Sequence, residues 1–445
     1  MKVSLKRQDR NQGNSRLWRI QKLIRCIFSE PQRFLKRLCI VSGTVLALGA
    51  GVALAAPGDP TDDWNLHGQD HFATTVHGIE LTDYIGSSLG TVYVDNIVNV
   101  SRFSESNASV FIDENHKISG LEADSSLLVK YLDSSGTIEN FTDVTVTDEL
   151  ANNTGAVVYG NGAGSTLNVS GALTNGGDIS FFSNVTAGSI NNNDSEADII
   201  GTGAGSILSA GSITNAGGIS DFSHVTSNGD IDNSSADAYI WGADGGSTLL
   251  ANGNLTNGGE VKYFETVKAL GDGAGIENSG TIAGEGAFSE LSAEGDLTNT
   301  KTVTGFASVA ADNISNDAAD ASITGTGAGS ALSAKTDLTN SGTIGDYALV
   351  SAGGDLTNDK TITGSGADSN LTAWNNLNNK GNITDFAQVH GGSLTNETDG
   401  TITGAGAGAD GNELVLEYAL DLLGIGKQFV VIADPFFQFR VFLLE

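Results

Sequence analysis

The feature that most constrains this chain is an internal repeat of about 40 residues. A phrase of the form Ile/Val-x-x-Phe/Tyr-x-x-Val recurs, and its successive aromatic residues are 41, 40, 42, 42, 41 and 39 positions apart. A fixed period of this length predicts stacked, similar units and not a set of separate globular domains. The aromatic residues that we expect to form an internal ladder are Phe141, Phe182, Phe222, Phe264, Phe306, Tyr347 and Phe386.

Each unit contains two similar halves, which the asparagine residues make visible. Asparagines that close Leu/Ile-x-Asn phrases are separated alternately by 17–21 and 21–24 residues. We expect each of them at a corner, where the amide bonds the backbone, tolerates left-handed dihedral angles and bonds the asparagine of the next coil. The expected members are Asn175, Asn215, Asn257, Asn299, Asn340, Asn358, Asn379 and Asn396, with Asn192, Asn233, Asn278 and Asn316 between them.

Apolar residues within each half lie at even offsets, which is the pattern of strands and not of helices. Leu332, Ala334 and Leu338 precede Asn340 in this way, and no proline interrupts residues 61–434. The predicted fold is therefore all-β: a right-handed parallel β-solenoid of about 20 residues per coil, paired into repeats of about 40. Repetition is needed because an isolated coil leaves its core and its backbone ladder uncovered.

The charge of the chain changes sign along its length. Of the 22 basic residues, 11 lie before residue 41, whereas residues 57–445 carry 11 basic and 51 acidic residues. A surface this acidic repels nucleic acid and anionic lipid. The sequence therefore predicts that the protein has no nucleic-acid partner.

Residues 1–56 have the order of a secretory signal. A long basic region comes first, residues 38–56 carry no charge, and an Ala-Leu-Ala phrase ends at Ala55. We expect cleavage between Ala55 and Ala56 and export through the general secretory pathway. An uncleaved membrane anchor is the alternative, because the uncharged run is long enough to span a bilayer. Both cysteines of the chain lie in this segment, so the exported remainder carries no disulfide.

The regularity of the repeat divides the rest of the chain into three parts. Residues 57–135 are less regular and are expected to form an N-terminal cap and the first, irregular coils. Residues 136–409 are expected to form the regular β-solenoid. Residues 410–445 fall outside the repeat, and three interpretations stay open: a capping helix plus strand, the truncated start of a further domain, or the product of a truncated or frame-shifted gene.

The long basic signal and the Gly/Asn/Thr-rich strand-repeat body together resemble the passenger domains of autotransporters and related haemagglutinin-type adhesins. Besides residues 1–56, the phrases that carry the resemblance are LTN, GTI and GTGAGS, from about Gly136 to Ala409. The resemblance implies a Gram-negative surface protein exported by type V secretion, with a β-helix passenger carried by a C-terminal outer-membrane barrel. The 36 residues after Ala409 are too few for such a barrel, so this chain departs from the family pattern there.

The sequence predicts no catalytic, cofactor or metal site. A lyase acting on acidic sugars needs a basic residue, and Arg102 is the only arginine between residues 57 and 439. A hydrolase needs two carboxylates across the scissile bond, and no pair is marked by an interruption of the repeat. The recurring phrase Gly-x-Gly-Ala-x-Ser predicts a tight turn with glycine dihedral angles. Calcium binding stays open at Asp244 and Asp368, where an aspartate stands in this phrase.

These patterns predict a function by class. We expect a secreted or cell-surface β-solenoid that acts, without catalysis, as an adhesin or a structural rod. Its expected partners are a surface glycan or protein of a host or neighbouring cell and, through the signal segment, the secretion machinery. The alternative is a secreted carbohydrate-active β-helix enzyme, either a polysaccharide lyase or a hydrolase.

Overall fold

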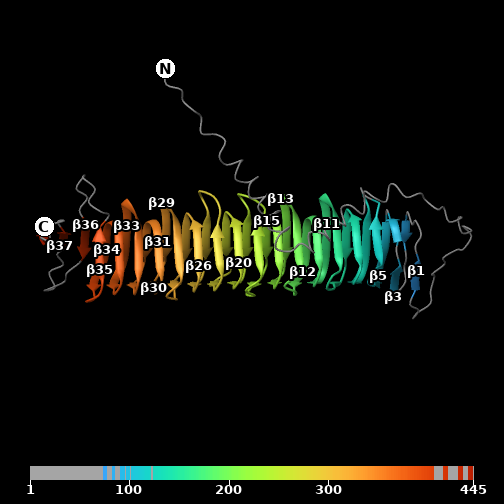
Figure 1. The fold of residues 1–445 in the computed structure, drawn as a ribbon, viewed down its shortest axis with the longest axis horizontal. Helices are drawn as coiled ribbons and strands as arrows, with labels where there is room; N and C mark the ends of the chain where they lie inside the picture. The colour runs from blue at the N-terminus through green and yellow to red at the C-terminus, as the bar shows by residue number, and fades with distance from the viewer. Residues whose placement is uncertain are drawn as a thin grey trace, which may run out of the picture. The chain divides into compact units, whose positions relative to one another are not determined.

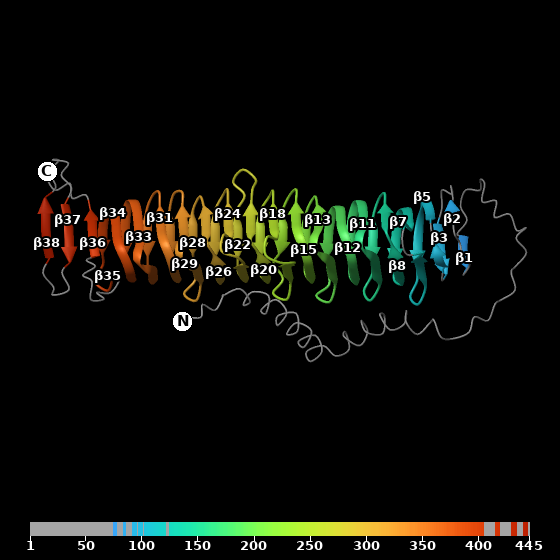
Figure 2. The ribbon, with the colours of Figure 1, turned by 90° about the horizontal axis from the view of Figure 1, so that it is seen from above.

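The chain divides into two compact units, Met1–Asn65 and Leu66–Glu445. The computed structural model describes residues 74–77, 83–85, 91–95, 97–100, 102–121, 124–404, 414–418, 429–433 and 439–443, all of which belong to the second unit. These residues form a right-handed parallel β-solenoid of about 15 turns, with coils of about 20 residues, which confirms the predicted fold class. Figures 1 and 2 show the consecutive coils side by side.

Three short strands make one coil, and each strand pairs in parallel with its counterpart in the next coil. Glu260 pairs with Thr281, Thr266 with Glu290, and Ile276 with Leu297. We call the three positions the first, second and third strand of a coil. In this example they are β20 (Glu260–Phe264), β21 (Thr266–Ala269) and β22 (Ile276–Asn278), which pair with β23 (Thr281–Gly284), β24 (Glu290–Ala293) and β25 (Leu297–Asn299).

The remaining strands follow the same scheme, and several run through a corner without a break. The N-terminal coils contain β1 (Thr74–His77), β2 (Asp83–Ile85), β3 (Thr91–Asp95), β4 (Ile97–Val100), β5 (Arg102–Ile112), β6 (Lys117–Gly120), β7 (Ser126–Ser134), β8 (Thr137–Phe141), β9 (Asp143–Val146) and β10 (Leu150–Asn152). The central coils contain β11 (Val157–Asn175), β12 (Asp178–Asn192), β13 (Asp198–Ala210), β14 (Ile213–Asn215), β15 (Gly218–Ser227), β16 (Ile231–Asn233), β17 (Tyr239–Gly242), β18 (Thr248–Ala251) and β19 (Leu255–Asn257). The C-terminal coils contain β26 (Thr302–Phe306), β27 (Ser308–Ala311), β28 (Ile314–Asn316), β29 (Ser322–Ala334), β30 (Leu338–Asn340), β31 (Thr343–Ala352), β32 (Leu356–Asn358), β33 (Thr361–Asn379), β34 (Asn382–Asn396) and β35 (Thr401–Gly404).

Parallel stacking extends beyond both ends of residues 136–409. Upstream, β1 already pairs in parallel with β3, and β5 pairs in parallel with β7. Downstream, β36 (Leu414–Tyr418) pairs in parallel with β34. The direction then reverses, because β37 (Phe429–Ala433) and β38 (Phe439–Leu443) add antiparallel strands to β36.

The interior of the solenoid is a set of columns in which one residue per coil occupies the same place. The second residue of the first strand is an isoleucine or valine in coil after coil, because alternate strand residues point inward and β-branched side chains fit the pleat. Ile219, Val261 and Ile344 are examples, and each is 0 % exposed.

The predicted aromatic residues lie in this core, but they occupy only every second coil. All seven are 0 % exposed, and the intervening coils place a glycine at the paired position. The ring of Phe306 covers Gly284, where an added Cβ would lie 2.7 Å from the ring Cδ1. Gly201 beneath Phe222 and Gly364 beneath Phe386 show the same arrangement, each with a Cβ position 2.8 Å from the ring. The period is about 40 residues, or two coils, because a coil with an aromatic side chain at this position alternates with a coil that has glycine there.

The inward residue of the second strand alternates in size in the opposite sense. Coils that carry an aromatic residue have a buried valine in the second strand, such as Val225 after Phe222, whereas glycine coils have a buried leucine, such as Leu249 after Gly242. Protein interiors are close-packed, so a large residue at one position requires a smaller one nearby. The core volume of each coil is thus kept similar although its composition alternates.

A left-handed residue precedes each aromatic residue of the core. Asp221, Asp346 and Asp385 have φ angles of 62°, 59° and 60°, and Gly305 has 76°. The buried serine that ends the glycine phrase of the preceding coil bonds the carbonyl of this residue: Ser206 Oγ donates to Asp221 O at 2.8 Å, and Ser330 Oγ donates to Asp346 O at 3.0 Å. The glycine phrase thus forms the turn of its own coil, and its serine also bonds the corner of the next coil.

Tyr347 differs from the other six core aromatic residues by one hydroxyl group. Its Oη is buried without a hydrogen-bond partner, and burial raises the pKa of Tyr347 far above its usual value. We expect Tyr347→Phe to raise the free energy of unfolding by about 1 kcal/mol, because the cost of an unsatisfied buried hydroxyl is removed. Urea denaturation measures the difference. Tyr93→Phe is the control, since Tyr93 is 38 % exposed, and a destabilised Tyr347→Phe variant would contradict the prediction.

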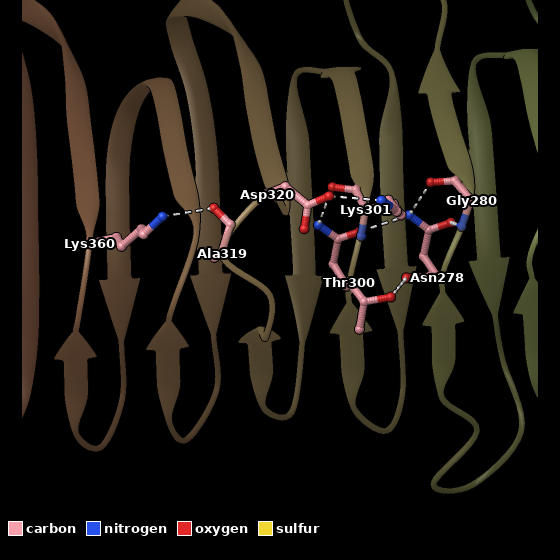
Figure 3. A network of polar contacts seen from close by, with 8 residues as sticks. Asn278, Gly280, Thr300, Lys301, Ala319, Asp320 and Lys360 are labelled. Carbon is pink, nitrogen blue, oxygen red and sulfur yellow. Dashed lines mark hydrogen bonds and ion pairs between the residues drawn. The ribbon is translucent and has the colours of Figure 1, made fainter.

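The asparagines at the end of each third strand form a continuous hydrogen-bonded ladder. Twelve Nδ2–H···Oδ1 bonds of 2.7–2.8 Å join thirteen asparagines, from Asn152 to Asn396. Asn278 Nδ2 also donates to the carbonyl of Gly280 at 3.2 Å (Figure 3). A further bond to the carbonyl of Thr302 at 3.0 Å closes the corner. All of these amides except that of Asn233 therefore bond a carbonyl of their own coil as well as the neighbouring coil or coils.

Ion pairs and backbone contacts on the outside of this corner cross between coils. Lys301 Nζ contacts Asp320 Oδ2 at 2.7 Å, and Lys360 Nζ donates to the carbonyl of Ala319 at 3.1 Å (Figure 3). These side chains are solvent-exposed, so each contact contributes little to stability.

Candidate functional site

The residues predicted from the repeat lie inside the solenoid and do not form a surface site. The seven core aromatic residues and the asparagines from Asn175 to Asn379 are almost completely buried, while Asn396 is more exposed at the last rung. The predicted signal-cleavage residues Ala55 and Ala56 lie outside the described residues. A partner of the described coils is therefore met by the outward positions of the strands and by the exposed corners between them.

The outward side of the first strands carries two clusters of aromatic residues. The ring centroids of Tyr159 and Phe181 are 4.5 Å apart on consecutive coils. Further along the same side, Tyr239 and Trp241 have ring centroids 4.4 Å apart, and Tyr263 of the next coil meets Trp241 edge-on at 6.0 Å. The repeat search missed these residues because they do not recur with the period.

Parallel register places the two clusters at the ends of one column of outward side chains. Tyr159 pairs with Ser180, Ser180 with Ile200, Ile200 with Ser220, and Ser220 with Trp241. We call these five residues the 159–241 column. It spans four coil steps of about 4.8 Å, or roughly 19 Å. Two serines and one isoleucine thus form a floor of small and medium side chains between aromatic ends.

A partly buried hydrogen bond orients one of the aromatic ends. Tyr239 Oη donates to Asp198 Oδ1 at 2.7 Å, and Asp198 is only 5 % exposed. The intervening residue is Gly218, whose missing side chain leaves room for the tyrosine ring and the carboxylate. The ring of Tyr239 is therefore held across the neighbouring coil by a charge-assisted hydrogen bond.

The other aromatic end stays protonated over a wide pH range. Burial, with a smaller contribution from the charge of Glu139, raises the pKa of Tyr159 above its usual value. Tyr159 is therefore a hydrogen-bond donor at any physiological pH. The residue beside it, Phe181, is 46 % exposed and has a left-handed φ of 63°.

Beyond Tyr263 the same side of the solenoid changes character. The outward positions of the first strands from residue 281 to residue 403 are Thr, Ser, Asn, Ala or Gly, and none is charged. Thr-x-Thr occurs at Thr302–Thr304 and Thr361–Thr363, and the Oγ1 of Thr384 donates to the Oγ1 of Thr363 at 3.2 Å. The outward side of the first strands thus carries aromatic and charged residues toward the N-terminus, among them Lys117 and Lys262, and is neutral toward the C-terminus.

The described basic residues are largely engaged in ion pairs. Lys262, Lys268 and Lys335 contact Glu260, Glu290 and Asp312 at 2.7, 2.7 and 2.9 Å. A lyase base must be placed to neutralise a substrate carboxylate and to remove a proton. Lysines whose charge a neighbour already balances are poorly suited to that role.

One pair of carboxylates interacts across the corners of two coils. Glu285 lies at the surface, and partial desolvation of its carboxyl group, with a smaller contribution from the charge of Asp244, raises the pKa of Glu285 above its usual value. A carboxyl group of raised pKa near a second carboxylate is the arrangement that glycoside hydrolases use. The sequence search passed over this pair because both residues lie in corner turns and are 41 positions apart.

The structure gives three further findings, on metal ligands, on the glycine phrase and on membrane-spanning helices. Among the described residues, no group of three or more His, Cys, Asp or Glu side chains is arranged to hold a metal ion. The serine of the glycine phrase at Asp368 bonds a carbonyl of its own turn, since Ser369 Oγ donates to Gly366 O at 2.6 Å. In the same described part of the chain, no helix is long and apolar enough to cross a membrane.

Comparison with family models, with curated proteins and with solved structures found no match to this chain.

Proposed function

We propose that the protein is an extracellular, non-catalytic adhesin whose β-solenoid displays outward side chains along a rigid stack of coils. The observation that supports this most directly is the pair of outward aromatic clusters at the ends of the 159–241 column. Aromatic side chains on a surface provide large contact area at low entropic cost. Backbone ladders in all three strand positions and the asparagine ladder hold this surface in place.

The proposed location follows from the N-terminal sequence. Residues 1–56 direct the chain to the general secretory pathway, and the acidic, disulfide-free remainder acts at the cell surface or after release. The resemblance to autotransporter passengers and haemagglutinin-type adhesins suggests a Gram-negative outer surface. The expected partner is a glycan or protein on a host or neighbouring cell.

A bead-adhesion assay tests this proposal. The full chain is coupled to beads, and retention on cultured epithelial cells and on Gram-negative bacteria is compared with beads that carry an unrelated protein of equal net charge. We expect retention on at least one cell type to exceed the control severalfold. Equal retention on every surface tested contradicts the adhesin proposal.

A carbohydrate-active hydrolase is the second candidate, and the raised pKa of Glu285 beside Asp244 is the observation that favours it. Both residues are exposed at corner turns, whereas a glycosidase encloses its substrate between its two carboxyl groups. Release of reducing ends from a polysaccharide panel, and its loss in Glu285→Gln, distinguishes this candidate from the adhesin.

A further inference from the structure

We propose that the 159–241 column is a binding site for an uncharged linear polysaccharide, which lies along the solenoid axis with sugar rings stacked on both aromatic ends. The inference rests on the adhesin function proposed above and names its ligand class. The aromatic ends are Tyr159 with Phe181, and Trp241 with Tyr239. The three residues between them form the floor.

The geometry of the ends suits the faces of sugar rings. The π face of an aromatic ring is negative, so it attracts the weakly positive C–H groups on one side of a pyranose. Two aromatic stacks about 19 Å apart, four coil steps of about 4.8 Å, can hold a chain of several sugars at two points. The hydrogen bond from Tyr239 to Asp198 fixes one platform before the ligand arrives, which reduces the entropy lost on binding.

The floor supplies unused hydrogen-bonding groups. Ser180 and Ser220 are 8 % and 4 % exposed, point outward between the aromatic ends, and make no side-chain hydrogen bond with another described residue. Neither hydroxyl belongs to the buried side-chain atoms that lack a partner, so each Oγ is reached by solvent and can bond the hydroxyl groups of a ligand above it. A protein partner that placed apolar side chains over this floor would leave both hydroxyls unpaired.

The charge around the column selects among polysaccharides. Asp178, Asp198 and Glu260 belong to the neighbouring outward column, and Asp221 lies at the adjoining corner. These carboxylates repel a polyanion such as a uronic-acid polymer, and the repulsion is strongest at low salt. Two lysines of the described chain lie near the ends of the column, and both are paired: Lys262 with Glu260 at 2.7 Å and Lys117 with Glu139 at 3.1 Å. The site therefore favours a neutral chain.

A third aromatic cluster, nearer the N-terminus, differs from the two aromatic ends of the 159–241 column. Tyr93, Phe111 and Tyr131 stack on consecutive coils, with centroid separations of 5.5 and 6.0 Å. Their rings contact one another without an intervening polar floor, which is the arrangement of a stabilising ladder. Phe288 and Trp374 are 85 % and 73 % exposed and make none of the ring contacts observed in the described part of the chain, so they serve as controls off the column.

The test uses the full chain and three neutral oligosaccharides, cellohexaose, mannohexaose and N-acetylglucosamine hexamer, with hexagalacturonate as the acidic arm. Isothermal titration calorimetry measures binding. Phe181→Asn removes a ring from one end and Trp241→Ser from the other. Phe181→Asn keeps the fold, because asparagine tolerates the left-handed φ of 63° at this position. The matched controls are Phe288→Asn and Trp374→Ser.

We expect at least one neutral hexamer to bind and hexagalacturonate to bind at least tenfold more weakly. Phe181→Asn and Trp241→Ser should each weaken binding about tenfold or more, as loss of a stacking platform does, while Trp241→Phe stays within a few-fold. The two control variants should bind like the parent. Equal melting temperatures of parent and variants show that each variant is folded.

Three results would each contradict the proposed binding site. In the first, a chain that adheres to cells binds none of the neutral hexamers. In the second, both column variants bind as the parent does, and in the third, hexagalacturonate binds more tightly than every neutral hexamer. The first result leaves the adhesin proposal intact and points to a protein partner. Failure of the bead assay combined with hexamer binding would instead contradict adhesion while supporting the site.

Discussion

Asn257→Leu is expected to lower the stability of the central coils by about 4 kcal/mol. Asn257 is 0 % exposed, its Nδ2 donates to Asn278 Oδ1 at 2.8 Å, and its Oδ1 accepts from Asn233 Nδ2 at 2.8 Å. Leucine removes both ladder bonds and also the bonds from Asn257 Nδ2 to the carbonyls of Gly259 and Thr281, both at 3.2 Å. Asn233 Nδ2 and Asn278 Oδ1 then keep only longer bonds, to Glu260 O at 3.4 Å and from Gly280 N at 3.3 Å. Each buried polar group that loses its partner costs roughly 1–3 kcal/mol, and the apolar side chain of leucine offsets only part of this cost.

Hydrogen exchange followed by mass spectrometry is the suitable measurement, because a solenoid opens locally and its stability is a sum over neighbouring coils. We expect faster exchange in the three coils around Asn257 and little change near either end of the stack. Asn168→Leu is the matched control: Asn168 is exposed on a second-strand position and makes no side-chain hydrogen bond with another described residue. The same exchange pattern in both variants would mean that the ladder contributes nothing.

The sequence predicted this ladder from spacing alone, except for its first rung. Asn152 bonds Asn175 at 2.7 Å, yet it closes a Leu-Ala-Asn phrase in a less regular part of the chain and was not included. In the preceding coil the ladder position is Ser134, whose hydroxyl does not reach Asn152. Both Ser134 Oγ and Asn152 Oδ1 are buried without a partner, which marks the end of the ladder.

The glycine phrase was predicted only in part. Its role as a tight turn is confirmed, since Gly203 and Gly205 have φ angles of 96° and 81°. The second role, in which Ser206 bonds the carbonyl of Asp221 in the next coil, could not be predicted. A periodic pattern shows that a serine recurs, but only coil register shows which corner it meets.

The candidate site was beyond prediction for a related reason. Repeat analysis finds like residues at equal spacing, whereas the 159–241 column consists of unlike residues: tyrosine, serine, isoleucine, serine and tryptophan. These residues become neighbours only when the pairing of each strand with the next is known. The sequence therefore predicted the scaffold, which is periodic, and not the surface, where the period is broken.

Phe306→Ala is expected to lower the free energy of unfolding of its coils by roughly 3–5 kcal/mol, because a fully buried ring leaves a cavity. The ring covers Gly284, whose added Cβ would lie 2.7 and 2.8 Å from Phe306 Cδ1 and Cε1. Gly284→Ala alone should therefore cost about 2 kcal/mol by overpacking. If the ring and the glycine form one packing unit, the two costs cannot be additive.

The double variant Gly284→Ala/Phe306→Ala tests this coupling. Without the ring, the methyl group at position 284 still meets the carbonyl oxygen of Gly305 at 3.0 Å but no atom of Phe306 at closer range, and it fills part of the cavity. We expect the double variant to be about 2 kcal/mol more stable than the sum of the single variants predicts. Gly345→Ala is the control on the first strand, because its Cβ would meet nothing within 4 Å and its φ is not left-handed, so its cost should stay within about 0.5 kcal/mol. Additive costs for Gly284 and Phe306 would show that the 40-residue period does not arise from their packing.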